Sequence, residues 1–363
     1  MIQTSDRWQE VTYIPHWQQL ISTGTFVLAG DIGGTNSNFG VMETSGHSPR
    51  LCMSIHSKSQ KVASFRTLLT DILQHLATTY NLVITRTCWG AAGVIGKERS
   101  HVKPTNLSLG IDTHELMRGT SLQECILIND FEAVGLGIDH IDPASIITIS
   151  AGQGIPGAQK ACIGAGTGLG KAALLWSNHQ QRYFPMASEG GHADCAAQSD
   201  EEYNFFTFLK AQQKRTCPIS WEDVLSGNGI TALYHFLGTT QAYKTTPISQ
   251  EIAATGFQPD LISRYAGEDE QCCDTFRMYT TFYARCAKNF ALDVLSQNGL
   301  YIAGGIAAKN VGVFTAQQFK DNFFMCGKQS ELLRNIPLFV VTNYNVSLYG
   351  SAAFLMLRDQ GVI

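Results

Sequence analysis

Three glycine-rich turns, each placed directly after an apolar run, are the most informative chemical feature of this sequence. They lie at Asp31–Asn36, Gly164–Gly170 and Ala303–Gly305. Glycine lets backbone N–H groups come close to an anion, because no Cβ stands in the way. Thr35 and Thr167 add hydroxyl donors suited to phosphate oxygens. For a single turn of this kind, hairpin geometry is the better explanation. Three of them, each after a strand, could converge on the phosphates of one nucleotide.

Two common nucleotide-binding motifs fail on spacing. A dinucleotide-binding GxGxxG needs a third glycine where this chain has Leu169 or Lys171, depending on the starting glycine. A P-loop GxxxxGK[ST] needs a glycine at Ala165 and a hydroxyl residue at Ala172. The sequence therefore predicts separate phosphate-binding turns. Their candidate contact residues are Asp31, Gly33, Gly34, Thr35, Asn36, Gly166, Thr167, Gly168, Gly304 and Gly305.

Asp130 is a candidate general base. It stands directly after the apolar run 124–129, and open α/β sheets commonly place functional side chains at the ends of strands. A carboxylate there can accept the proton of an attacking hydroxyl. It can equally be the N-cap of the helix that the following residues predict. The residues alone leave these two interpretations open.

Glu189-Gly190-Gly191-His192 forms a second polar cluster. Glu-x-x-His spacing on a helix is typical of a metal site, but two glycines argue against a helix here. An ion pair in a surface turn and a pair of ligand contacts both remain open. Glu222 also has two interpretations. It can contact a ligand, or Trp221-Glu222-Asp223 can simply be the polar start of a helix.

The elements that must hold these residues alternate between strand and helix patterns. Apolar runs at 26–29 and 39–42 flank the first glycine turn, and further strands are expected at 88–95, 124–130, 146–150, 161–166, 299–305 and 338–343. Apolar residues follow a helical spacing at 65–77, and further helices are expected at 201–211, 274–296 and 347–358. Strands that alternate with long helices indicate an α/β architecture.

Composition narrows the class of protein. At 363 residues the chain suits two domains, and its net charge of −4 comes without a basic block for nucleic acid. No apolar run reaches the length of a membrane helix, and the polar N-terminus lacks the apolar core of a signal peptide. Ten scattered cysteines without a CxxC pair indicate free thiols in a reducing compartment and no zinc site. We therefore expect a cytoplasmic protein that binds neither nucleic acid nor a membrane.

Five motifs in a fixed order carry a family resemblance. LAGDIGGTN, LINDFEAVG, IGAGTGLG, SEGGH and GLYIAGGI together resemble the bacterial-type glucokinases of the hexokinase/actin-like superfamily, over nearly the whole chain from about residue 26. The resemblance implies two similar α/β domains of the actin-like ATPase (ribonuclease H-like) type with a cleft between them. It also implies a small domain of residues 1–140 plus 343–363 and a large domain of residues 141–342.

The resemblance assigns roles to the residues above. It implies transfer of the γ-phosphoryl group of ATP to glucose, with Asp130 accepting the proton of the sugar's primary hydroxyl. The sugar contacts that match the family's motifs are Asn106, Asn129, Asp130, Glu189, His192 and Glu222. Asp31 matches an acidic residue near the metal-bound phosphates, which implies an indirect contact to the Mg²⁺ that accompanies ATP. Gly304 and Gly305 match the adenosine motif.

Two departures from the family stand out. The chain has 25 residues before its first apolar run, where the family has only a few. Trp8, Val11, Ile14 and Trp17 suit packing of this extension onto the body of the chain or onto a second subunit of a homodimer. The cysteine-rich zinc motif of the repressor–kinase branch is missing after His192, so we expect the chain to fall outside that branch.

Rival functions from other classes have weaker support. A sugar-responsive regulator needs a DNA-binding module, yet the extension is neither basic nor patterned like a helix-turn-helix. An actin-like filament protein explains the phosphate turns but leaves Asn129, Glu189 and His192 without a purpose. A kinase for another hexose, and ADP or polyphosphate as the donor, are alternatives that the residues leave open.

Overall fold

The computed structural model describes residues 2–5, 8–13, 17, 24–105, 107–240 and 242–363. The chain forms two compact units. The first holds the residues up to Ser145 together with Leu174–Ala187 and Asn343–Ile363. The second holds Ile146–Ala173 and Ser188–Thr342. Strands and helices alternate along the chain, as the sequence pattern predicts.

In the described part of the chain, the strands belong to two large sheets and one small ribbon. The first sheet contains β1 (Ile2–Ser5), β2 (Trp8–Tyr13), β3 (Phe26–Ile32), β4 (Asn36–Glu43), β5 (Arg50–Lys58), β6 (Arg86–Ala91) and β9 (Glu124–Asn129). The second contains β10 (Ile146–Ser150), β11 (Lys160–Ala165), β12 (Leu169–Ser177), β13 (Arg182–Ser188), β14 (Leu300–Ala303) and β15 (Leu338–Val341). The ribbon pairs β7 (His101–Val102) with β8 (Ile111–Asp112).

The helices have the following bounds. Those of the first unit are α1 (Phe65–Tyr80), α2 (Thr113–Met117), α3 (Asp130–Gly137) and α14 (Val346–Asp359). Those of the second are α4 (Asp200–Gln213), α5 (Trp221–Val224), α6 (Gly227–Thr240), α7 (Pro247–Ala254), α8 (Pro259–Arg264), α9 (Glu270–Asp293), α10 (Gly305–Lys309), α11 (Val311–Thr315), α12 (Gln317–Phe324) and α13 (Ser330–Asn335). Among the described residues, no helix combines the length and hydropathy that crossing a bilayer requires.

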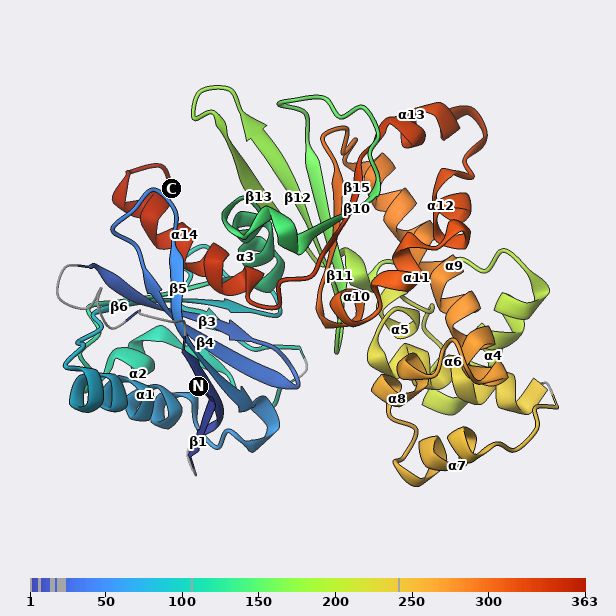
Figure 1. Ribbon diagram of the computed structural model, residues 1–363, viewed down its shortest axis with the longest axis horizontal. Coiled ribbons are helices and arrows are strands. Elements are labelled where there is room, and N and C mark those ends of the chain that lie inside the picture. Colours follow the sequence, from blue (N-terminus) through green and yellow to red (C-terminus); the bar gives the residue numbers. More distant parts are fainter. Residues whose placement is uncertain (1, 6–7, 14–16, 18–23, 106, 241) are drawn as a thin grey trace. The chain divides into compact units, whose positions relative to one another are not determined.

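The first sheet is covered by helices on both faces. Because side chains alternate along β3, Leu28 and Ile32 join the core beneath α1 and α2. Val27 and Ala29 point the other way and join a core with α3 and α14. Figure 1 shows the two helix pairs on opposite sides of this sheet. The alternation therefore places Asp31, at the end of β3, on the face that α14 covers.

The two sheets repeat one strand order. In the first, β5-β4-β3-β6-β9 lie side by side, and in the second the run is β13-β12-β11-β14-β15. In each run, the three strands that come first along the chain lie in reverse order, third, second and first. Two later strands then follow, both parallel to the first. The turns at Gly33 and Gly166 both join the first strand of a run to the second. The first two glycine turns thus occupy equivalent places in a duplicated architecture.

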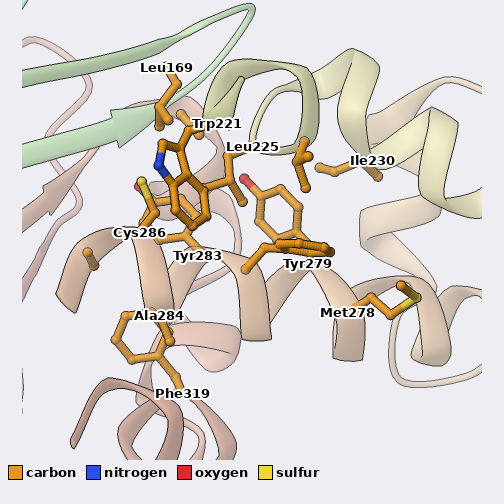
Figure 2. Close-up of a cluster of buried hydrophobic side chains, with 14 of the residues drawn as sticks. Leu169, Trp221, Leu225, Ile230, Met278, Tyr279, Tyr283, Ala284, Cys286 and Phe319 are labelled. Atoms are coloured by element: carbon orange, nitrogen blue, oxygen red, sulfur yellow. The ribbon is translucent and has the colours of Figure 1, made fainter. Parts of the chain in front are cut away.

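Helix α9 forms the centre of the second unit. Its buried face carries Tyr279, Tyr283 and Cys286, which lie in the largest core cluster. Figure 2 shows Trp221 of α5 and Leu169 of β12 packed at the end of this cluster next to Tyr283 and Cys286. The segments that carry Glu222 and the second glycine turn are therefore anchored in the same apolar core.

The N-terminal extension packs onto its own unit. β2 pairs antiparallel with β5 and so adds a strand to the first sheet. Val11 and Trp17 are buried, and the Trp17 ring meets the Tyr80 ring of α1 edge-on with centroids 4.9 Å apart. Ile14 lies outside the described residues, as does the Trp8 side chain. Of the two alternatives for the extension, packing onto the body of the chain is the one that its described residues follow.

Several element boundaries differ from those expected. The strand expected at 88–95 runs from Arg86 to Ala91, and the strand expected at 124–130 ends at Asn129. The second difference has a local cause, because Asn129 caps the next helix and Asp130 is already its first residue. Helix α9 starts at Glu270, where the side chain of Asp269 accepts a hydrogen bond from the Cys272 N–H.

Helices α3 and α14 touch backbone to backbone. A Cβ on Gly137 would lie 1.9 Å from the carbonyl oxygen of Val346, and one on Gly350 would lie 1.7 Å from that of Ala133. Real Cβ atoms do not approach oxygen this closely, so both positions require glycine. Figure 1 shows the two helices side by side. The crossing places Ala133, in the first turn of α3 that also carries Asp130, against Gly350 of α14, and it places Gly137, the last residue of α3, against Val346, the first residue of α14.

We predict that Gly350→Ala disrupts this crossing. The new methyl group has to push the two helix backbones apart, and overpacking of this kind costs about 1–3 kcal/mol. Thermal unfolding should show a lower midpoint, and turnover should fall because Asp130 moves with α3. Gly96→Ala is the matched control, since a Cβ there meets nothing within 4 Å. Equal midpoints for the two variants would contradict this account of the crossing.

Candidate active site

Asp31 heads the candidate phosphate site of the first unit. The residue as a whole is partly exposed, but its carboxyl group is turned into the protein and accepts hydrogen bonds from the side chains of Ser347 and Asn38. Burial raises the pKa of Asp31, and these two hydrogen bonds oppose the rise because they favour the charged form. Ser347 lies in the first turn of α14, whose N-terminal end favours negative charge.

The first glycine turn is fixed by hydrogen bonds from a neighbouring segment. Gly33 N–H donates to the Asn36 carbonyl at 2.9 Å and closes the turn. The hydroxyl of Ser59 donates to the Gly33 carbonyl at 2.6 Å, and the Ser59 N–H donates to the Thr35 carbonyl at 2.9 Å. Gly34 is buried, whereas Thr35 and Asn36 are exposed. The turn therefore holds its backbone rigidly and presents the Thr35 and Asn36 side chains outward.

Asn129 and Asp130 have different roles at the start of α3: one caps the helix, and the other is its first residue. The Asn129 side-chain oxygen accepts from the N–H groups of Phe131 and Glu132 at 3.0 and 3.2 Å, and its amide donates to the Gly93 carbonyl at 3.3 Å. Asn129 is therefore the N-cap, and the interpretation of Asp130 as the N-cap is wrong. Asp130 is partly exposed, and one of its carboxylate oxygens accepts from the Phe131 N–H at 2.9 Å.

The second glycine turn and the third lie together in the second unit. Gly166 N–H donates to the Gly168 carbonyl at 2.8 Å, and Gly227 N–H, at the start of α6, donates to the Gly166 carbonyl at 3.0 Å. Gly304 has φ +89°, and a Cβ there would lie 2.7 Å from the Ala165 carbonyl oxygen. Only glycine fits that position. The second glycine turn, the third glycine turn and the first turn of α6 are therefore in direct backbone contact.

Glu189 and His192 lie on the short 3-10 turn that follows β13. Their side chains are about half exposed, and His192 Nε2 lies 3.8 Å from Glu189 Oε2. Glu189 precedes the turn and His192 ends it, which brings the two polar groups to one side. The glycines between them prevent a regular helix, as expected from the sequence, and the pair stays available to a ligand.

Glu222 connects the second glycine turn to this polar pair. Its Oε2 accepts a hydrogen bond from Leu169 N–H at 2.9 Å, directly after Gly168. The N–H of Trp221 donates to the carbonyl of Ala193, the residue after His192, at 3.0 Å. The second unit therefore brings Glu189, His192, Glu222 and the second glycine turn into one site. The predicted sugar contact Asn106 lies outside the described residues.

The thiols near these motifs are buried and unreactive. Burial raises the pKa of Cys162, in β11, and of Cys195, three residues after His192, so both stay protonated at neutral pH. A protonated thiol is neither a good nucleophile nor a metal ligand. Among the described residues, no group of three or more His, Cys, Asp and Glu side chains could hold a metal ion.

Some residues of the site could not be predicted from the sequence. Ser347 and Asn38 bind Asp31, and Gly227 binds the second turn, yet none of them was expected to take part. Gly227 had a usable signal, since the segment Ser226–Gly229 is a further glycine pair before a helix. Ser347 is more than 300 positions from Asp31 in the chain and has no local signal.

Comparison with known proteins decides the family. A protein-family model described as glucokinase matches residues 28–358. The glucokinase of Nostoc punctiforme is 33% identical over 349 residues, which cover 90% of this chain and 98% of that relative. The chain belongs to the glucokinase family. Its reaction is the ATP-dependent phosphorylation of glucose to glucose 6-phosphate, as the five motifs predicted.

Solved structures of other glucokinases share the fold. The glucokinase from Balamuthia mandrillaris in complex with glucose matches with a TM-score of 0.79 at 18% identity, over 93% of this chain and 96% of that one. A ROK family glucokinase from Streptomyces griseus in complex with glucose and AMPPNP matches with a TM-score of 0.63 at 17% identity, over 91% and 99%. The expected fold class, two α/β domains of the actin-like ATPase type, is confirmed.

Glu222 gives a prediction that separates turn positioning from sugar binding. Glu222→Ala removes the acceptor of the Leu169 N–H, and an unsatisfied buried N–H costs about 1–3 kcal/mol. The apparent KM should rise about tenfold for ATP, because Leu169 follows the second glycine turn, and for glucose, because Glu222 is itself a predicted sugar contact. Glu222→Gln keeps an acceptor oxygen, so it should raise mainly the KM for glucose. Steady-state kinetics with each substrate varied test this, and an unchanged KM for ATP in Glu222→Ala would contradict it.

Proposed function

We propose that Asp130 is the general base of this glucokinase reaction. The carboxylate accepts the proton of the glucose primary hydroxyl as that oxygen attacks the γ-phosphorus of ATP and the bond to the ADP oxygen breaks. The observation that carries the proposal is the cap: Asn129 satisfies the start of α3, so Asp130 is not needed for helix capping. One Asp130 oxygen accepts from the Phe131 N–H, which orients the carboxylate.

The nucleotide phosphates are proposed to bind the glycine turns. Asp31, Gly33, Gly34, Thr35 and Asn36 serve the phosphates in the first unit, and Gly166, Thr167 and Gly168 in the second, with Gly304 and Gly305 at the adenosine. Exposed Thr35 and Asn36 side chains and a backbone surface without Cβ atoms suit anionic oxygens.

Mg²⁺ fits this arrangement as a companion of ATP. It prefers oxygen ligands, keeps several waters and needs only one or two carboxylates beside nucleotide phosphates. The Asp31 carboxylate can serve as that ligand: burial raises its pKa, and its two hydrogen bonds oppose the rise because they favour the charged form. When bound, the ion neutralises charge on the phosphate oxygens. The chain's own task is to hold Asp31 charged and in place.

The sugar hydroxyls are proposed to bind Asn129, Asp130, Glu189, His192, Glu222 and Asn106. The amide of Asn129 uses one N–H for the Gly93 carbonyl and keeps a second for a ligand. The half-exposed Glu189 and His192 offer an acceptor and a donor side by side. A comparison of glucose with mannose and glucosamine as acceptors measures the selectivity of the proposed contacts.

The cellular setting is also a proposal. The free thiols of the described cysteines suit a reducing cytoplasm. Assembly into a homodimer stays a prediction, and sedimentation at several protein concentrations tests it. The expected lack of nucleic-acid and membrane partners also stays a prediction.

Asp130→Asn isolates the proton transfer. Asn is nearly isosteric and keeps the acceptor for the Phe131 N–H, so the fold and the thermal midpoint should change little. We expect kcat to fall by about 10²–10⁴, because Asn cannot accept the proton. A coupled assay of ADP formation measures turnover. Asp112→Asn is the matched control, since Asp112 caps α2 with the same carboxylate chemistry. Near-normal turnover in Asp130→Asn would return this residue to a structural role.

Glu189→Gln tests the sugar site. The change keeps the size of the side chain and removes its charge, and hydrogen bonds to charged groups contribute about 1.5–3 kcal/mol. The kcat/KM for glucose should fall accordingly, with nucleotide affinity less altered. A variant that binds ATP more weakly while its glucose kinetics stay intact would refute the assignment.

A further inference from the structure

Asp31 stands at one end of a polar row that crosses three neighbouring strands. Asp31 on β3 is the direct cross-strand partner of Asn38 on β4, and Asn38 is that of His56 on β5. Directly opposed residues point to the same face of a sheet. The row therefore lies on the face that α14 covers, in line with the contact between Asp31 and Ser347.

The hydrogen bonds of this row have a definite direction. Nδ1 of His56 lies 2.6 Å from the Oδ1 of Asn38. An amide oxygen only accepts, so the imidazole carries its proton on Nδ1 and donates. This fixes the Asn38 amide with its NH2 group toward Asp31, where it donates to the carboxylate. If the amide were turned around, its oxygen would face the carboxylate and repel it.

The row is not needed to complete the sheet. Backbone pairing of β3, β4 and β5 runs through the register on both sides of it. The neighbouring side chains Phe39 and Ile55 are buried on the opposite face, where they supply apolar contact. Asp31, Asn38 and His56 are all only partly buried. Their side chains thus contribute a specific orientation of one carboxylate instead of core volume.

We infer that Asn38 and His56 are positioning residues that hold the Asp31 carboxylate in the orientation required by the phosphates of ATP and the accompanying Mg²⁺. This inference rests on the proposed role of Asp31 at the nucleotide. His56 acts through Asn38 and touches neither substrate. It makes β5, a strand that carries none of the family's motifs, part of the nucleotide site.

Kinetics of four variants test the inference. Asn38→Ala removes the donor to Asp31, and His56→Leu removes the group that orients Asn38. His56→Asn is the conservative variant, because its amide nitrogen takes the place of imidazole Nδ1 and keeps a donor. Asp31→Asn reports on the carboxylate itself. We expect a KM for MgATP about threefold to tenfold higher in Asn38→Ala and His56→Leu, as for the loss of one hydrogen bond, with an unchanged KM for glucose.

Rescue and coupling separate positioning from simple destabilisation. His56→Asn should restore the KM for MgATP to within about twofold of the parent. His56→Leu should add nothing once Asp31→Asn is present, because interacting residues are not additive. Ser54→Ala, two residues along β5 on the same face, is the control for a change in that strand and should leave both KM values unchanged.

The outcomes distinguish this inference from the proposal beneath it. If Asp31→Asn alters the MgATP kinetics but neither His56→Leu nor Asn38→Ala does, the positioning role is overturned and the role of Asp31 stands. If Asp31→Asn leaves the MgATP kinetics unchanged, the role of Asp31 fails, and the inference fails with it. Equal rises of KM for glucose and MgATP would indicate general destabilisation and also overturn it. Asn38→Ala carries the test should His56→Leu fail to fold.

Discussion

The contact between α3 and α14 is the constraint on which the first unit's functional groups depend. Gly137 and Gly350 let the two backbones meet, and any side chain at either position would separate them. Helix α3 presents Asp130 at its first residue, and α14 presents Ser347 to Asp31. The hydroxyl of Ser351 also donates to the Gly30 carbonyl at 3.3 Å, which fastens α14 to β3. A single close crossing thereby sets the positions of Asp130 and of the side chain that binds Asp31.

The repeated strand order explains why a glycine turn appears at the same place in both sheets. In each sheet a tight glycine turn joins the first strand to the second, and a parallel strand follows on the other side. The two copies have diverged in what surrounds them. Ser59 pins the first turn through its hydroxyl and its N–H, whereas Glu222 and Gly227 pin the second. The same backbone device is thus held by unrelated side chains.

The local parts of this structure can be predicted from the sequence. The glycine turns, the strands before them and the helices α1, α9 and α14 follow from apolar periodicity and from glycine placement. The long-range partners do not, because nothing near Asp31 in the chain points to Ser347 or to His56. Strand β5 was missed as well, since its polar residues His56 and Ser57 interrupt the apolar pattern that marks a strand.

The same limit explains the ambiguity at the start of α3. Asn and Asp cap helices about equally well, so Asn129-Asp130 offers two candidates for one cap, and composition cannot choose between them. The backbone decides: Asn129 has extended φ and ψ angles and is the last residue of β9, so its side chain faces the open N–H groups of α3. Asp130 is the first residue of the helix, and its carboxylate shares only the Phe131 N–H with the cap. Since a general base must be able to change its charge during each turnover, a cap made by the neutral Asn129 lets Asp130 gain and lose a proton without loss of the cap.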